Sequence, residues 1–518
     1  MLSFMAPKIE NPIIQGFFPD PSMIRVRDNF YVVNSSFEYF PAIPIFHSRD
    51  LVHWRQIGNV VTCADQGLDL SDVRPSGGVQ AATIRHHDGV FYVTSTRVKS
   101  EWPRLDYHFI VTATDINGPW SKCHFIENAE GIDSSLFFDD DGKTYFLANR
   151  QRENATSGND TEIWMSEINL TTFQLVGEKI SLWAGTGGIY PEGPRLFKRH
   201  GWYYLLIAEG GTLHHHTTTM ARSRNVHGPY ESCARNPIMT HRYLPREHPI
   251  HNVGHADMVE LQDGSWWGVA LASRPRGGFY DGGNTIYTFG GYYRNLGRET
   301  FLFPISWPDD ESPVFSPDTG KIDFEYPAPS LPLSEQTDVP YDFSAESLAI
   351  KWVRIRNTEA NASVVDSGAL SLTLSDSLED SFYGVRQNSW KFRMCFDVDV
   401  SALKAGDVFM CGAYIKEGHY LAMEFRKSDG IEISIGSATE SQPRRDFTSA
   451  DNSFRVEITG DDQDYCFTLL GKEFAHTLDG REISCDMTDS HTGVMLGFWG
   501  VSGSNSPVML SNFTYEKL

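Results

Sequence analysis

An internal repeat of one hairpin constrains the fold of this 518-residue chain more than any other feature. Five times an apolar strand runs into a tight turn and then into an aromatic strand. The copies are SMIRVRDNFYVVNSS, ATIRHHDGVFYVTST, SLFFDDDGKTYFLAN, PRLFKRHGWYYLLIA and MVELQDGSWWGVALA. Asp-Asn, Asp-Gly and His-Gly at the turns suit tight hairpins, in which the backbone φ angle is often positive. Such self-similarity at a nearly fixed period is typical of repeat architectures.

The spacing of the hairpins predicts one four-stranded sheet for each copy. The turn residues are numbered 29, 89, 142, 201 and 264, so successive spacings are 60, 53, 59 and 63 residues. Each interval accommodates one propeller blade. A run of unrelated hairpins is the alternative, but the near-even spacing favours the propeller. We therefore predict an all-β chain that begins with a five-bladed β-propeller over residues 9–326.

The repeat also places one polar residue of each copy at a shared position. Counting nine residues back from each turn residue gives Asp20, Gln80, Asp133, Glu192 and His255. In a propeller the first strand of each blade lines the central channel, so the residue that opens it faces the axis at one rim. Any one of these residues alone would be read as a turn or core residue. Together, five convergent polar groups predict the floor of a pocket.

Three carboxylates in one pocket are typical of the cleavage of a glycosidic bond. That reaction needs an acid on the leaving oxygen and a base or nucleophile on the other face of the sugar. Two carboxyl groups with separated pKa values supply these roles, and a third raises the pKa of the acid by like-charge repulsion. Glu192 has the longest side chain and lies in Tyr-Pro-Glu-Gly-Pro, whose prolines restrict the backbone. We therefore predict that Glu192 is the acid.

The segments around these carboxylates resemble glycoside hydrolase family 43. The resemblance covers the whole propeller, in GFFPDPS, VNSSFEYFPAIPIFHSRDLVHW, GIDSSLFFDDDGKTYF, YPEGPRLFK, AEGGT, GHADMVE and GRETFL. It implies an inverting mechanism in which Asp20 is the general base to a water and Glu192 is the general acid. Asp133 would tune the pKa of the acid and hold it in place.

The same resemblance implies the other residues of the site. Arg298 of GRETFL and Phe37 of SSFEYF would contact the terminal sugar, Thr212 of AEGGT would bind substrate, and His255 would support the pocket. The resemblance requires no cofactor. In some relatives a Ca²⁺ or a water lies at the propeller axis, and His255 is the residue here that would hold such a supporting ion.

These sequence motifs most resemble those of a branch of β-xylosidases and α-L-arabinofuranosidases that carry a C-terminal β-sandwich. The resemblance therefore implies an exo-acting enzyme that releases terminal xylose or arabinose from xylo-oligosaccharides, arabinoxylan or related hemicellulose fragments. One departure concerns the pocket. Relatives read GGIWAP or GGIYAP where this chain has GGVQAA, residues 77–82, so Gln80 replaces an aromatic wall. We expect Gln80 to contact the sugar and to alter the substrate preference.

Two alternatives stay open at this point. An arabinan- or galactan-cleaving hydrolase of the same fold would need an open groove rather than a closed pocket. A non-catalytic sugar-binding protein built on the same scaffold is the third hypothesis. The intact set of Asp20, Asp133 and Glu192 argues against a protein without activity.

A second domain follows a linker over residues 327–340, which is rich in proline and polar residues. The alternating segments LSLTL, FRMCFDVDV, YLAMEFR and FRVEITG predict a β-sandwich of the jelly-roll or concanavalin-like kind over 341–518. In the family branch, this sandwich places an aromatic residue beside the terminal sugar. Glycines flank Phe498 and Trp499, which favours a loop or bulge. One of the two rings is therefore expected at the sugar, with burial of both in the sandwich core as the alternative.

Charge and cysteine usage restrict the partners and the compartment. A net charge of −23 argues against nucleic acid and anionic membranes, which reward clustered Lys and Arg. Seven scattered cysteines without CxxC spacing indicate reduced thiols rather than disulfides or a zinc site. The start MLSFMAPKIE is too short for a signal-peptide core, so we predict a cytoplasmic protein, with secretion as the alternative. The expected partner is a xylo- or arabino-oligosaccharide, and a homo-oligomer stays open.

Overall fold

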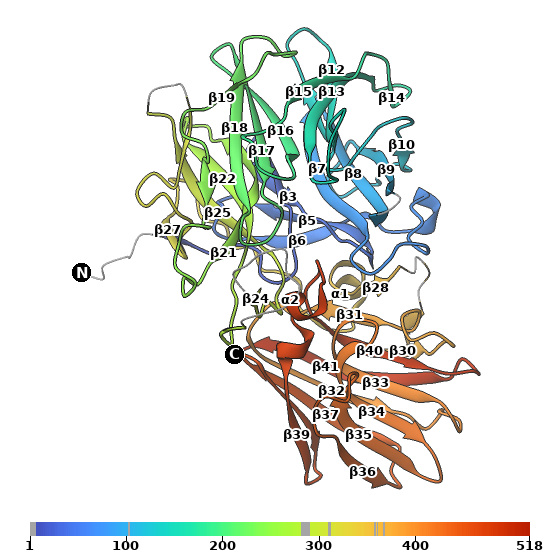
Figure 1. Ribbon diagram of the computed structural model, residues 1–518. Coiled ribbons are helices and arrows are strands. Elements are labelled where there is room, and N and C mark those ends of the chain that lie inside the picture. Colours follow the sequence, from blue (N-terminus) through green and yellow to red (C-terminus); the bar gives the residue numbers. More distant parts are fainter. Residues whose placement is uncertain are drawn as a thin grey trace.

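The chain folds into two β domains, which lie one above the other in Figure 1. This computed structural model describes residues 7–101, 104–280, 291–308, 312–356, 359, 361–365 and 368–518. Within these residues the α-helices are only α1 (Ala345–Ile350) and α2 (Cys485–Thr488). The predicted all-β class is confirmed. None of the helices described is both long and apolar enough to cross a membrane.

The first domain is a five-bladed β-propeller, as predicted, and each blade is an antiparallel meander. Each hairpin of the sequence repeat forms the first two strands of one blade. The strands run β2 (Ser22–Val26), β3 (Asn29–Val33), β5 (Ala42–Ser48), β6 (Arg55–Val61) in blade one; β7 (Gly78–His87), β8 (Val90–Glu101), β9 (Arg104–Ala113), β10 (His124–Phe125) in blade two; β11 (Ser135–Phe138), β12 (Thr144–Gln151), β13 (Thr161–Asn169), β14 (Gln174–Leu175) in blade three; β16 (Glu192–Arg199), β17 (Trp202–Glu209), β18 (Thr217–Ser223), β19 (Glu231–Ser232) in blade four; and β21 (His251–Glu260), β22 (Trp266–Ser273), β25 (Glu299–Ser306), β26 (Val314–Phe315) in blade five.

The first strands of the blades surround the axis and contact one another. Strand β2 contacts both β7 and β21, and β11 contacts both β7 and β16. The edge strands β15 (Ile180–Trp183) and β20 (Met239–Thr240) add to blades three and four. Apolar side chains fill the space between neighbouring blades, so the rim of the channel is left to polar residues.

The two ends of the propeller segment are joined to each other. Strand β1 (Lys8–Glu10) pairs with β27 (Glu325–Pro327). The buried Asn11 side chain donates hydrogen bonds to the carbonyls of Leu302 and Asp323, at 2.8 and 2.9 Å, and accepts one from the Leu302 N–H at 2.8 Å. These bonds attach the N-terminal segment to blade five and close the ring of blades.

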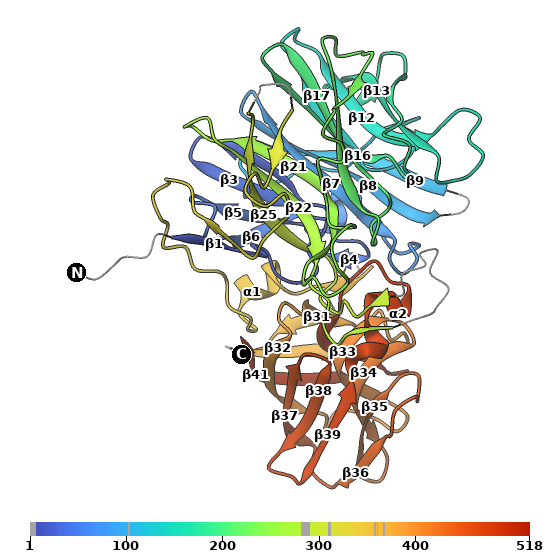
Figure 2. The same cartoon turned by 60° about the vertical axis from the view of Figure 1, so that its left-hand side comes forward.

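The second domain is a β-sandwich, also as predicted, whose two sheets lie face to face in Figure 2. Its buried aromatic and aliphatic side chains alternate along the strands with exposed polar ones, as in β37. The seven-stranded sheet has the order β29 (Ala362–Val364), β30 (Ala369–Thr373), β41 (Pro507–Lys517), β32 (Lys391–Asp399), β37 (Ser453–Asp461), β38 (Asp464–Leu470), β39 (Phe474–Asp479). The six-stranded sheet has the order β31 (Tyr383–Arg386), β40 (Met495–Val501), β33 (Val408–Lys416), β34 (His419–Lys427), β35 (Ile431–Ser437), β36 (Arg445–Ser449).

The sandwich packs directly against the propeller. Strand β28 (Arg354–Ile355) pairs with β4 (Tyr39–Phe40) of the propeller. The segment predicted as a linker lies along blade one, where the Ser334 N–H donates to Asp50 Oδ2 at 2.7 Å. One apolar cluster spans the contact and includes Phe17, Phe37 and Tyr39 from the propeller and Met410, Tyr414 and Trp499 from the sandwich. The two domains therefore share a buried core.

Two carboxyl groups lie at this domain interface, Glu38 buried and Glu379 partly buried. Oε1 of Glu38 accepts a hydrogen bond from the Ser76 N–H at 3.1 Å, and its Oε2 has no partner among the described residues. Glu379 accepts a hydrogen bond from the Tyr414 hydroxyl at 2.8 Å and forms an ion pair with Arg356. Burial raises the pKa of Glu38 to about 7, and the Ser76 N–H and Arg356 counteract this only in part. Glu38 is therefore buried most favourably in its protonated form.

The raised pKa predicts a pH-dependent contribution of Glu38 to stability. Because the folded-state pKa is about 7 and the ordinary value is 4.5, this contribution is fully present below about pH 4.5 and is lost as the pH rises through about 7. Glu38→Gln is neutral at every pH and avoids that loss. We expect the melting temperature of Glu38→Gln relative to the unsubstituted protein to rise from pH 5 to pH 8 in thermal melts. The exposed Glu432→Gln should show no such trend. An equal difference at both pH values for Glu38→Gln would contradict a protonated Glu38.

Candidate active site

A cavity of about 500 Å³ lies where the first strands of the blades begin. The structure brings all five residues of the shared register to this cavity: Asp20, Gln80, Asp133, Glu192 and His255. Phe37, Thr212 and Arg298, which the family resemblance implied, line it as well. Every blade thus contributes to one site, and the sandwich adds Asp489 and His491.

A residue in the left-handed backbone conformation lies just before the first strand of each blade or within its first half. Asp20, Asp133 and His255 have φ angles of 54°, 61° and 51°. In blades two and four the left-handed residue comes one position later, at Ala81 and Gly193, where the strand pairing also shifts its register. Residues other than glycine rarely adopt this conformation, and such strain concentrates at functional sites. The repeated turn brings one polar residue of each blade to the cavity.

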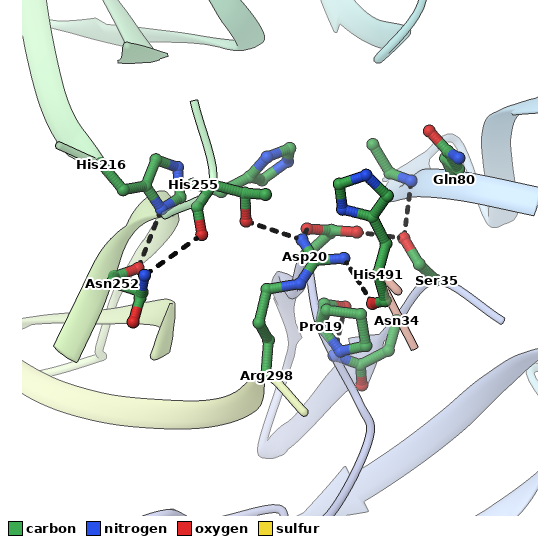
Figure 3. Close-up of polar contacts among 12 residues, drawn as sticks. Pro19, Asp20, Asn34, Ser35, Gln80, His216, Asn252, His255, Arg298 and His491 are labelled. Atoms are coloured by element: carbon green, nitrogen blue, oxygen red, sulfur yellow. Dashed lines mark hydrogen bonds and ion pairs between the residues drawn. The ribbon is translucent and has the colours of Figure 1, made fainter. Parts of the chain in front are cut away.

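Asp20 is a buried carboxylate with two strong partners (Figure 3). Its Oδ2 accepts a hydrogen bond from the Ser35 hydroxyl at 2.5 Å, and its Oδ1 lies 3.1 Å from Nη1 of Arg298. Burial raises the pKa of Asp20, but the Arg298 guanidinium, assisted by the Ser35 hydroxyl, lowers it below the ordinary value. Asp20 is therefore held ionised, as a proton acceptor must be.

Arg298 connects Asp20 to the other walls of the cavity. The same Nη1 donates to the Thr212 hydroxyl at 3.0 Å, and Nη2 donates to the backbone carbonyl of His491 at 3.1 Å. The guanidinium also lies over the Phe37 ring, 5.4 Å from its centre. One side chain of blade five thus fixes blade one, blade four and a loop of the sandwich.

Beneath the cavity lies a buried charged network that the sequence interpretation missed. Arg195 is fully buried, with Nε 3.6 Å from Oδ2 of Asp257 and Nη2 3.4 Å from Nε2 of His255. The same Asp257 oxygen accepts hydrogen bonds from the Ser22 hydroxyl at 2.7 Å and from Arg85 at 3.1 Å. Arg195 lies between Pro194 and Leu196-Phe197 in the first strand of blade four, and a charged residue in this short apolar stretch was the available signal.

His255 is neutral and does not fit a calcium ion. Burial lowers the pKa of His255 to about 3, and its Nε2 accepts from Arg195, since a guanidinium can only donate. A Ca²⁺ ion takes six to eight oxygen ligands, whereas His255 offers a nitrogen that faces a cation. Across the described part of the chain, no group of three or more His, Cys, Asp or Glu side chains is arranged to hold a metal.

Asp133 and Glu192 complete the carboxylate set and differ in exposure. Asp133 is only 4% exposed, and its N–H donates to the Thr96 hydroxyl at 3.1 Å. Glu192, at the start of β16, is partly exposed to the cavity. A Cβ on the next residue, Gly193, would lie 2.9 Å from the His255 ring, so glycine there permits this close packing. The carboxyl that must meet a substrate oxygen is therefore the more accessible one.

The expectation that Phe498 or Trp499 lies beside the sugar is wrong. Both belong to the regular strand β40, both are fully buried, and neither lines the cavity. Phe498 packs in the sandwich core against Phe396, and Trp499 points to the domain interface beside Tyr414. Alternation along the strand sends the two rings to opposite faces.

The flanking glycines have another cause. A Cβ on Gly497 would lie 2.6 Å from the carbonyl oxygen of Tyr383, and one on Gly500 would lie 2.2 Å from that of Val408. Gly497 and Gly500 therefore permit close approach of neighbouring strands rather than a projecting loop. The sandwich instead reaches the cavity through the turn after α2, with Asp489 in the left-handed conformation and His491 following. No sequence signal singled out this polar turn.

Comparison with known proteins covers both domains. Residues 9–313 match the family model described as glycosyl hydrolases family 43, and residues 340–516 match the beta xylosidase C-terminal concanavalin A-like domain. A xylosidase/arabinosidase of Butyrivibrio fibrisolvens is 39% identical over 82% of this chain and 81% of the relative. A non-reducing end alpha-L-arabinofuranosidase of Bacteroides ovatus is 32% identical over 99% of this chain and 95% of the relative. The solved structure of a xylan beta-1,4-xylosidase from Bacillus halodurans is 28% identical, with a TM-score of 0.88 over 98% of this chain and 100% of that chain.

Proposed function

The chain belongs to glycosyl hydrolases family 43, and we propose that it is an exo-acting, inverting enzyme that releases terminal xylose or arabinose. Its substrates are xylo-oligosaccharides, arabinoxylan or related hemicellulose fragments. The observation that carries this proposal is the convergence of Asp20, Asp133 and Glu192 on one cavity, with Asp20 held ionised by Arg298. The names of the two relatives supply the sugar class.

The shape of the site supports release of a single terminal sugar. The cavity, at about 500 Å³, has the size of a small-ligand pocket, and Asp489 and His491 of the sandwich form part of its wall. A long polysaccharide that is cut internally needs a groove that is open at both ends. The wall contributed by the sandwich therefore favours an exo-acting enzyme over the arabinan- or galactan-cleaving alternative. The intact carboxylate set favours an enzyme over a sugar-binding protein.

The three carboxyl groups divide the reaction among them. Glu192 donates its proton to the glycosidic oxygen as the bond to the anomeric carbon breaks. Asp20 takes a proton from the water that attacks the same carbon from the opposite face. Asp133 keeps Glu192 oriented and raises its pKa by like-charge repulsion. Each turnover consumes one water and leaves the proton of that water on Asp20, from which it returns to Glu192 through solvent.

The surface chemistry supports a proposal for the compartment and the partners. All seven cysteines are unpaired, and Cys63 is exposed, which suits a reducing compartment such as the cytoplasm. The net charge of −23 disfavours nucleic acid and anionic membranes as partners. The partner that we propose is the oligosaccharide substrate.

We expect the purified protein to hydrolyse aryl β-D-xyloside, aryl α-L-arabinofuranoside or both, and to liberate monosaccharide from xylo-oligosaccharides one unit at a time. The values of kcat/KM for the two aryl glycosides and chromatography of early products measure this. Because a pocket closed on one side admits only a chain end, dye-linked polymeric arabinan or galactan should release no soluble fragments. Fragmentation of these polymers without release of pentose would instead select the endo-acting alternative.

Glu192→Gln should separate substrates by their leaving groups. Natural oligosaccharides have poor leaving groups that need protonation, so we expect turnover to fall by about 10²–10⁴-fold. A strongly acidic phenol leaves without being protonated, so turnover of its aryl glycosides should fall much less. Initial rates on both substrate types give the comparison, and Glu162→Gln, outside the cavity, is the matched control. Equal losses on both substrate types would remove Glu192 from the role of acid.

Asp20→Asn should abolish activity on every substrate, because activation of water is common to all of them. The unsubstituted enzyme should release a sugar of inverted anomeric configuration, which proton NMR of the first-formed product detects. Asn retains the shape and the Ser35 contact but cannot take a proton. Retention of configuration would make one carboxylate a nucleophile and would overturn the assignment of Asp20 as the base.

A further inference from the structure

Two hydrogen-bonding side chains from different domains stand on one side of the cavity. Gln80 comes from blade two and His491 from the sandwich, and both line the cavity. Figure 3 shows them on the same side of Asp20 and Arg298, opposite His216 and His255. We call Gln80 and His491 the polar wall. Gln80 stands at the position where the resemblance to the family implies an aromatic residue in relatives.

Ser76 holds the two members of the polar wall together. Its carbonyl accepts a hydrogen bond from Nε2 of Gln80 at 3.1 Å, and its hydroxyl accepts one from the backbone N–H of His491 at 3.0 Å. The same hydroxyl lies 3.2 Å from that of Ser490. A single propeller residue thus sets the position of a propeller side chain and of a sandwich loop.

The sandwich loop is fixed at both of its ends. Arg298 donates to the carbonyl of His491, and the Val494 N–H donates to the carbonyl of Asn295 at 2.7 Å. Between them, a Cβ on Gly493 would lie 2.9 Å from the carbonyl oxygen of Leu296. Only glycine permits the loop to approach the propeller so closely. Contacts with the propeller therefore fix the backbone of His491, although this residue belongs to the other domain.

The location of the polar wall identifies the part of the substrate that it meets. Asp20 must lie beside the water that attacks the anomeric carbon of the terminal sugar. Groups adjacent to Asp20 and Arg298 therefore face that sugar rather than the leaving group. Since Gln80 uses Nε2 on Ser76, and its Oε1 accepts no hydrogen bond from the residues that the structure describes, this oxygen is available to a sugar hydroxyl.

We propose that the polar wall determines specificity by hydrogen-bonding the hydroxyl groups of the terminal pentose, in place of aromatic stacking. The proposal rests on the proposed function and goes further by naming the residues that recognise the sugar. A site built to hydrogen-bond a hydroxyl rejects an analogue that lacks it, because its own polar groups are then left without a partner. Stacking on an aromatic ring is far less sensitive to the loss of one hydroxyl.

Deoxy analogues test this directly. The substrates are the aryl glycoside of the pentose that the enzyme prefers and its analogues lacking one hydroxyl at a time, except the 2-hydroxyl, which also stabilises the transition state. For at least one analogue we expect kcat/KM of the unsubstituted enzyme to fall by 10²-fold or more, as a polar site requires. In Gln80→Leu or His491→Phe, kcat/KM for the parent substrate should fall, whereas kcat/KM for the deoxy analogue should not. The ratio of kcat/KM for the parent to kcat/KM for the analogue should then drop by at least about 10-fold.

Matched substitutions outside the cavity are Gln262→Leu and His227→Phe, both at exposed positions, and these should leave the ratio unchanged. The ratio compares two substrates on one preparation, so a partly unfolded variant does not alter it. Unchanged ratios in both cavity variants, or an unsubstituted enzyme that tolerates every analogue, would overturn the proposal. An enzyme that hydrolyses neither parent pentoside would instead refute the proposed function, and the two failures are thus distinguishable.

Discussion

The ion pair between Arg298 and Asp20 is the interaction on which the site depends. It joins blade five to the neighbouring blade one, and the same guanidinium reaches Thr212 of blade four and the backbone of the sandwich. Both groups are nearly buried, so their attraction is little weakened by solvent. The ion pair holds Asp20 in the ionised form that the proposed role as base requires, and it fixes the geometry of four separate segments at once. Stability and chemistry are therefore coupled at this point.

The charged groups of the site surround the carboxyl groups of Asp20 and Glu192 differently, which suits them to different proposed functions. Asp20 has a cation and a hydroxyl donor within hydrogen-bonding distance, which lowers its pKa despite burial. Glu192 is more exposed, and the His255 ring that packs against the neighbouring Gly193 carries no charge at neutral pH, because burial lowers the pKa of His255 to about 3. Arg195 and Asp257, beneath the cavity, carry opposite charges and form an ion pair. Separation of acid and base thus arises from where the propeller places its few buried cations.

The sequence predicted those parts of the structure that repeat. One hairpin recurs five times, so a single register identified Asp20, Gln80, Asp133, Glu192 and His255 as members of one cavity. The contacts that occur once were not predictable in this way. Phe498 and Trp499 were misjudged because glycines beside them permit close strand packing, which resembles a loop signal in the sequence. His491 and Arg195 were missed because their roles depend on tertiary contacts across the domain interface and the axis.

The sandwich is better understood as a part of the active site than as an appended module. Glu38, buried at the domain interface, accepts the N–H of Ser76, and Ser76 in turn holds both Gln80 and His491. The interface carboxyl of Glu38 is therefore connected through the single residue Ser76 to the polar wall of Gln80 and His491. A shared apolar core makes separation of the domains costly, and the domains approach so closely at Gly493 that no side chain fits there. Because Asp489 and His491 of the second domain line the pocket of the first, we expect substitutions at the interface to alter substrate selection as well as folding.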